Sequence, residues 1–175
     1  RQTIKFDKKL LDIDAVQVVK MLIKSGYQAY LVGGCIRDLL LGYEPKDFDI
    51  ATNATPEQVN KTFKRSRIIG RRFRLVHIMF SARKFIEVAT FRAGKVKTSN
   101  SGIVVRDNFY GSLKDDVFRR DFTVNALYYD LVNSQVIDYV GGLDDLKSAE
   151  IKMIGNPKER FEEDPVRMIR AVRFK

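Results

Sequence analysis

The chain has 175 residues, of which 45% are hydrophobic, and its formal net charge is +10 from 32 basic and 22 acidic residues. This length suits one folded domain with a sizeable core, and no apolar run is long enough to span a bilayer. One cysteine, Cys35, excludes a disulfide framework, and with a single histidine it also excludes a cysteine–histidine zinc cluster. The excess positive charge favours a polyanionic partner such as nucleic acid or a nucleotide.

The first half of the chain alternates helical and extended patterns. Apolar residues at helical spacing, together with N-caps and terminal glycines, predict helices over 10–26, 33–42 and 55–63. Short apolar runs bounded by turn residues predict strands over 27–32, 47–52, 74–81 and 84–91. The last two strands are close enough in the sequence to form a hairpin.

The second half is predicted to be richer in helix. We expect, in order, a loop over 92–112, a helix over 113–130, a strand within 135–142, a helix over 144–150, a strand over 151–155 and a closing helix over 156–175. Strand hairpins and helices are mixed without a repeating strand–helix unit, so the sequence favours an α+β fold over a doubly wound α/β fold.

Two acids stand one residue apart in the stretch "KDFDIAT". Because side chains alternate across a strand, Asp47 and Asp49 are expected on one face, with Phe48 and Ile50 on the other. Two neighbouring carboxylates repel each other. A divalent cation would remove this repulsion, and Mg²⁺ prefers carboxylates together with substrate phosphates. The alternative to a metal site is a solvated strand end, at which the two acids bind no cation.

A glycine turn precedes these acids in the stretch "LVGGCIRDLLLG". Gly33 and Gly34 would let backbone N–H groups approach a phosphate, and Arg37 lies in the first turn of the following helix. A phosphate cradle beside a pair of metal-binding acids indicates a nucleotide site, although a glycine pair alone is only a tight turn.

Further charged residues could complete such a site. Glu87 lies mid-strand among apolar residues, where a third carboxylate would serve nucleotidyl transfer. Asp121 is expected on the apolar face of the helix over 113–130, where Arg119 and Arg120 could pair with it, or could contact phosphate while Asp121 orients them or a sugar hydroxyl. Near the end of the chain, donors and acceptors that could contact a base or phosphates are expected along one helix, at Asp164, Arg167, Arg170 and Arg173.

Five stretches together resemble the class II nucleotidyltransferases, the family of bacterial poly(A) polymerases and tRNA CCA-adding enzymes. They are "LVGGCIRDLLLG…KDFDIAT", "IEVATFR", "RRDFTVNALYYD", "GGLDDL" and "EDPVRMIRAVRF", and they cover the chain from about residue 27 to its end. The resemblance implies a polymerase-beta-like head, a small mixed sheet with flanking helices, over 1–155. It implies that 156–175 begins a helical neck, with the body and tail domains absent.

The resemblance also implies roles for particular residues. Asp47 and Asp49 match the metal-binding pair, which would hold two Mg²⁺ ions or Mn²⁺ in their place, and Glu87 matches an additional acid nearby. The expected contacts of the triphosphate, the ribose and the base fall on Gly33, Gly34, Arg37, Arg120, Asp121, Asp164, Arg167, Arg170 and Arg173.

The segment "IIGRRFRLVHIMF" resembles bacterial poly(A) polymerases more than the CCA-adding branch. Its arginines around Phe73 would suit an RNA backbone and stacked bases. The leading hypothesis is therefore template-independent addition of AMP from ATP to an RNA 3′ end by a monomeric bacterial cytoplasmic enzyme. Two alternatives remain open here: addition of CCA to tRNA, and an RNA-binding or nucleotide-binding module without catalysis.

Overall fold

The computed structural model describes residues 1–71, 73–93 and 110–172. Eight strands form one mixed sheet in the order β1-β8-β7-β2-β3-β6-β5-β4. Their bounds are β1 Gln2–Thr3, β2 Ala29–Val32, β3 Asp49–Thr52, β4 Ser66–Ile69, β5 Leu75–Met79, β6 Phe85–Thr90, β7 Tyr128–Asp130 and β8 Gln135–Ile137. Only β3 and β6 pair in parallel among the named strand pairs of the described residues. The sheet and its flanking helices confirm the predicted α+β class.

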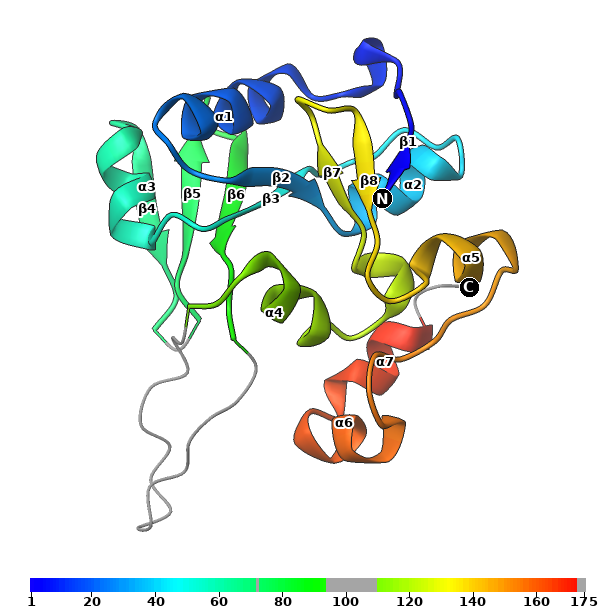
Figure 1. The fold of residues 1–175 in the computed structure, drawn as a ribbon. Helices are drawn as coiled ribbons and strands as arrows, with labels where there is room; N and C mark the ends of the chain where they lie inside the picture. The colour runs from blue at the N-terminus through cyan, green and yellow to red at the C-terminus, as the bar shows by residue number, and fades with distance from the viewer. Residues whose placement is uncertain (72, 94–109, 173–175) are drawn as a thin grey trace, which may run out of the picture.

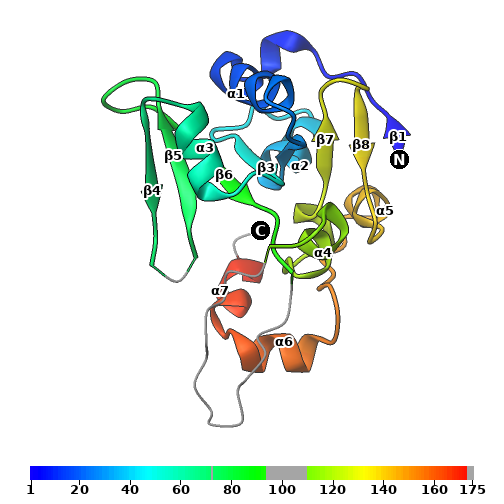
Figure 2. The same cartoon turned by 60° about the vertical axis from the view of Figure 1, so that its left-hand side comes forward.

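The helices are short and lie on both faces of the sheet (Figure 1). Their bounds are α1 Ile13–Lys24, α2 Gly34–Leu40, α3 Pro56–Thr62, α4 Leu113–Phe118, α5 Gly142–Lys147, α6 Pro157–Glu163 and α7 Val166–Val172, with 3-10 turns η1 at Lys8–Leu10 and η2 at Thr123–Asn125. In two views α6 and α7 lie beyond α4, on the side of the molecule away from α1 (Figure 1 and Figure 2).

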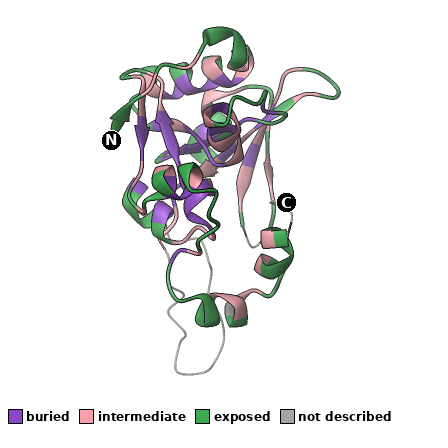
Figure 3. Cartoon of the chain, turned by 90° about the vertical axis from the view of Figure 1, so that its right-hand side faces the viewer, coloured by how far each residue is buried: buried purple, intermediate pink, exposed green. Residues whose placement is uncertain are grey.

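Two hydrophobic cores lie on opposite faces of the sheet. The larger core joins α1, α2 and α3 to the side chains of Leu31, Ile50 and Val88. The smaller core packs Leu113 and Val117 of α4 against the opposite face. The purple ribbon of Figure 3 is concentrated in the strands, whereas α6 and α7 are mostly exposed. The head thus has its own cores, and the last two helices contribute little to them.

The predicted helix over 113–130 is wrong beyond Phe118. Arg119 caps α4, Phe122 is extended, and residues 128–130 form β7. Phe122 bridges to Met153, and the N–H of Thr123 donates to the carbonyl of Lys152 at 3.0 Å. This pairing with a distant segment replaces the helix, and the aromatic and β-branched residues of "FTVNALYY" suit extended backbone.

Other predicted elements also change. Strand β4 was not predicted, and the strand expected over 151–155 is only the isolated bridge at Met153. The closing helix divides into α6 and α7 at Asp164, which caps α6 with extended backbone. A residue before proline disfavours the helical region, and Pro165 follows Asp164. Most of the predicted loop over 92–112 lies outside the described residues.

Candidate active site

The register of the sheet brings the glycine turn and the predicted acids together. Val32 at the end of β2 pairs with Asp49 at the start of β3, and Asp49 pairs in turn with Glu87 of β6. Gly33 and Gly34 follow Val32 directly, so the glycine turn begins beside Asp49. Within the stretch "KDFDIAT", Phe48 and Ile50 are buried whereas Asp47 and Asp49 are exposed. The predicted alternation is confirmed, although Asp47 precedes the strand.

The Asp49 carboxyl group experiences the predicted repulsion. Its pKa is raised to about 6, because loss of hydration and the charges of Glu87 and Asp47 together outweigh the opposing charge of Arg120. A divalent cation would stabilise the ionised form. Among the described residues no three Asp, Glu, His or Cys side chains form a complete metal-binding cluster. Two exposed carboxylates at the start of β3 fit Mg²⁺, which usually completes its shell with water and phosphate oxygens.

The glycine turn has a backbone conformation that only glycine adopts easily. Gly33 has φ 82° and ψ −136°, and its N–H donates to the carbonyl of Leu127 at 3.1 Å. Arg37 follows one turn later, where its guanidinium donates to Asp38 and to Asn125 at 2.7 and 2.8 Å. The arginine is therefore fixed in orientation beside the turn. Asp38 and Asn125 were not singled out by the sequence.

Alanine substitutions at Gly33 and Gly34 should have different effects on stability and on nucleotide binding. Gly33→Ala forces a Cβ into a positive-φ conformation and is expected to lower the free energy of unfolding by about 1–3 kcal/mol. At Gly34 a Cβ would lie 3.4 Å from the Arg37 guanidinium. Gly34→Ala should therefore keep or slightly raise stability, since alanine favours helix, while it raises the KM for a nucleotide. Denaturant unfolding measures the stability of each variant, and initial rates measure its KM. Equal losses of stability in the two variants would contradict this prediction.

A buried carboxylate, Asp116, organises the "RRD" stretch. Its side chain is 1% exposed, and it accepts bonds from Arg119 at 2.7 Å and Arg120 at 3.2 Å. The Tyr128 hydroxyl donates to Asp116 and accepts from Arg120 at 2.6 Å. Of the two possibilities considered for Arg119 and Arg120, pairing with Asp121 is wrong, because both arginines pair with Asp116. The signal that was missed is the helical spacing of Asp116 to both arginines.

Asp121 instead joins the head to α7. It accepts from Arg167 at 2.8 Å and pairs with Arg170 at 3.0 Å. Since α4 ends before Asp121, the predicted place of Asp121 on the apolar face of a helix over 113–130 is wrong. Asp164 lies between α6 and α7 and pairs with Arg170 at 2.9 Å, so it does not share a helix with Arg167 as expected. Arg173 lies outside the described residues.

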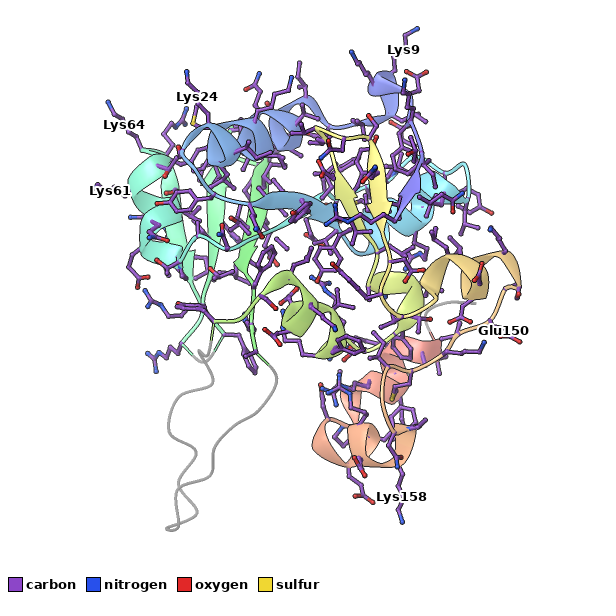
Figure 4. All side chains as sticks on the ribbon, viewed as in Figure 1. Lys9, Lys24, Lys61, Lys64, Glu150 and Lys158 are labelled. Carbon is purple, nitrogen blue, oxygen red and sulfur yellow. The ribbon has the colours of Figure 1, made fainter. Side chains whose placement is uncertain are left out.

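The predicted RNA-contacting segment, residues 68–80, includes the end of β4, the connection to the next strand and the whole of β5. Phe73 is 47% exposed, and the Arg92 guanidinium lies 4.8 Å from the centre of its ring. Arg74 pairs with Glu57 of α3. Arg72 lies outside the described residues. Positive charge is also found elsewhere on the surface. Lys24, Lys61 and Lys64 project from the molecule beside α1 and α3 (Figure 4).

The paired acids, the glycine turn and the fixed arginines on this mixed sheet define a polymerase-beta-like nucleotidyltransferase fold. The family described as the poly A polymerase head domain matches residues 29–152, and the chain belongs to this family. Poly(A) polymerase I of Haemophilus influenzae is 54% identical, with 92% of this chain and 37% of the relative covered. Poly(A) polymerase I of Escherichia coli O157:H7 is 53% identical, covering 95% and 38%.

CCA-adding enzymes are also similar. That of Bacillus pumilus is 41% identical, covering 91% of this chain and 39% of the relative. The crystal structure of the Bacillus stearothermophilus CCA-adding enzyme in complex with CTP has a TM-score of 0.75 at 39% identity, covering 91% of this chain and 38% of the other. The chain thus spans well under half the length of these relatives. Among the described residues no helix is both long and apolar enough to cross a membrane.

Proposed function

We propose that the protein containing this chain adds AMP from ATP to RNA 3′ ends without a template and releases pyrophosphate. The observation that carries the proposal is the pairing of Val32 with Asp49, which sets the glycine turn beside the acid pair. A triphosphate held at the turn would have its reacting phosphorus next to the carboxylates. Positioning and charge stabilisation are the main needs of this chemistry.

Sequence identity to the known relatives favours the addition of adenylate over the addition of CCA. The two relatives named poly(A) polymerase I are 53% and 54% identical to the chain, against 41% for the Bacillus pumilus CCA-adding enzyme. Addition of CCA to tRNA is therefore one outcome of the test below. The ATP and RNA partners, the monomeric state and a bacterial cytoplasmic location belong to the same proposal.

The side chains divide into those that would hold cations and those that would hold the nucleotide. Asp47 and Asp49 would hold Mg²⁺, or Mn²⁺ in its place, with Glu87 contributing negative charge beside them. When bound, the metal supplies a Lewis acid that acidifies the RNA 3′ hydroxyl and neutralises phosphate charge. Gly33 and Gly34 allow close approach of the triphosphate, and Arg37 and Arg120 are oriented for phosphate oxygens.

The last helices would contribute the remaining contacts. Asp121 holds Arg167 and Arg170, so it positions them and could also bond a ribose hydroxyl. Asp164 and Arg167 would meet the base, and Arg173 would add a further cation. In this proposal 1–155 forms the catalytic head and 156–175 begins the neck.

Nucleotide selection by the full-length enzyme tests the function. We expect incorporation of AMP into a generic RNA 3′ end, with little incorporation from CTP. A tRNA lacking its terminal CC serves as the second substrate. Strong CMP incorporation on that tRNA would establish CCA addition instead, and tight RNA binding without Mg²⁺-dependent turnover would establish a non-catalytic module.

A further inference from the structure

We propose that His77 is a positioning residue that holds Glu87 beside the acid pair, an inference that rests on the proposed nucleotidyl transfer. No sequence motif assigned a role to His77, which is the only histidine of the chain. Glu87 is predicted to act near the metal-binding acids, so the group that fixes its carboxylate would affect the reaction without touching the substrate.

Sheet register places His77 and Asp49 on opposite sides of Glu87. Glu87 of β6 pairs with Asp49 of β3 and with His77 of β5. Directly paired residues in neighbouring strands point to the same face, so the three side chains form one row across the sheet. The adjoining row of Ile50, Val88 and Val76 is buried in the larger core.

His77 makes two contacts that restrain it. Its Nε2 lies 3.3 Å from a carboxylate oxygen of Glu87. Its ring stacks on Phe85, with ring centroids 4.0 Å apart and an interplanar angle of 15°. The imidazole is 23% exposed and the Glu87 side chain 39%. The ring is therefore held by packing, while the carboxylate it contacts reaches the surface.

The forces on Glu87 explain why it needs such a partner. Its charge and that of Asp49 repel each other, since Glu87 is among the groups that raise the pKa of Asp49. A glutamate side chain also has high rotamer entropy, and an unrestrained carboxylate would turn towards water. The hydrogen bond from His77 opposes both tendencies and keeps the negative charge over β6, next to Asp49.

The test uses the full-length enzyme with single and double variants. We expect His77→Leu to lower kcat for AMP incorporation about tenfold, as outer partners of metal-site ligands commonly do, with little change in the KM for ATP. His77→Gln should recover most of the loss, because its amide N–H can donate to Glu87. In a Glu87→Gln background, His77→Leu should cause no further loss. Met79→Leu, on the same strand and face, is the matched control.

A spectroscopic measurement tests the same contact without turnover. The imidazole N–H signal of His77 is identified by its loss in His77→Gln, and Glu87→Gln should shift it. Equal kcat losses from His77→Leu in the wild-type and Glu87→Gln backgrounds would overturn the proposal, as would an unshifted signal. If the His77→Leu protein does not fold, the activity of His77→Gln and the shift of the imidazole signal in Glu87→Gln test the proposal in its place. Absence of AMP incorporation by the wild-type enzyme refutes the proposed function instead, and the signal still reports the contact.

Discussion

Asp49→Asn is expected to reduce AMP incorporation by the full-length enzyme about 1,000-fold, because a neutral amide cannot replace a carboxylate at a site that must attract divalent cations. Asp49 is the acid that the sheet register places beside both the glycine turn and Glu87. Incorporation of labelled AMP at an RNA 3′ end measures the loss. Asp144→Asn, at a side chain that is 88% exposed, is the control and should retain full activity.

The same variant should fold more stably than the wild type at neutral and alkaline pH. The pKa of Asp49 is raised to about 6, mainly by loss of hydration and by Glu87. The wild-type protein therefore loses stability as pH rises from about 4 through 6, whereas asparagine does not titrate. Since Asp49 is exposed, water screens part of the repulsion, and we expect a gain of about 1 kcal/mol at pH 8.

Denaturant unfolding of both proteins at pH 4 and pH 8 checks this pH dependence. The stability difference should be small at pH 4 and appear at pH 8. An Asp49→Asn protein that is less stable at pH 8 would show that the carboxylate supports the fold, and the argument from repulsion would be wrong. Loss of activity with a gain in stability is the combination expected of a residue kept for function.

Asp116→Ala is expected to have the largest effect on stability. The substitution would leave Arg119 and Arg120 without their buried partner and the Tyr128 hydroxyl without its acceptor. Breaking a buried ion pair by removing one member costs about 3–5 kcal/mol. AMP incorporation should fall as well, because Arg120 would lose its fixed orientation. Denaturant unfolding measures the first effect, and Asp144→Ala is the matched surface control.

The pH dependence of this cluster has the opposite sign to that of Asp49. Burial alone would raise the pKa of Asp116, but the charges of Arg120 and Arg119 and the hydrogen bonds from Tyr128 and the Arg92 N–H together outweigh it, so the pKa is lowered. The stabilisation is thus present above the ordinary aspartate pKa and lost as pH falls through the lowered value. The stability gap between wild type and Asp116→Ala should narrow in acid. An unchanged unfolding midpoint at neutral pH would contradict the proposed role of the cluster.

Local patterns predicted the first half of the fold well. The helix N-capped by Thr55 and the strands around Asp49 and Glu87 lie close to their expected positions. These elements carry their own signals, namely a capping box at the helix and, in β6, alternation of buried residues with more exposed ones. The acid pair and the glycine turn could be found for the same reason, because each is a short pattern of adjacent residues.

Long-range pairing accounts for what the sequence did not reveal. The segment from Phe122 to Tyr128 has helical spacing, but it bonds to residues 152–153 and joins the sheet as β7. The partners of Asp121 lie 46 and 49 residues further along the chain at Arg167 and Arg170. No periodicity within one element could show these contacts. The pairing of Asp116 with Arg119 and Arg120 was missed because the adjacent Asp121 is an equally good partner for these arginines in the sequence.

The acids of "KDFDIAT" have a second consequence, for the folding of the sheet. Strand β3 has four residues and lies between β2 and β6, and Asp49 and Ile50 occupy opposite faces. A one-residue shift that put Asp49 in the place of Ile50 would bury the Asp49 carboxylate in the larger core and force Ile50 into the place of Ala51 in the smaller core. Burying an unpaired carboxylate is far more costly than misplacing an apolar side chain. The residues proposed to bind magnesium would therefore also discriminate against misaligned strand pairing while the protein folds.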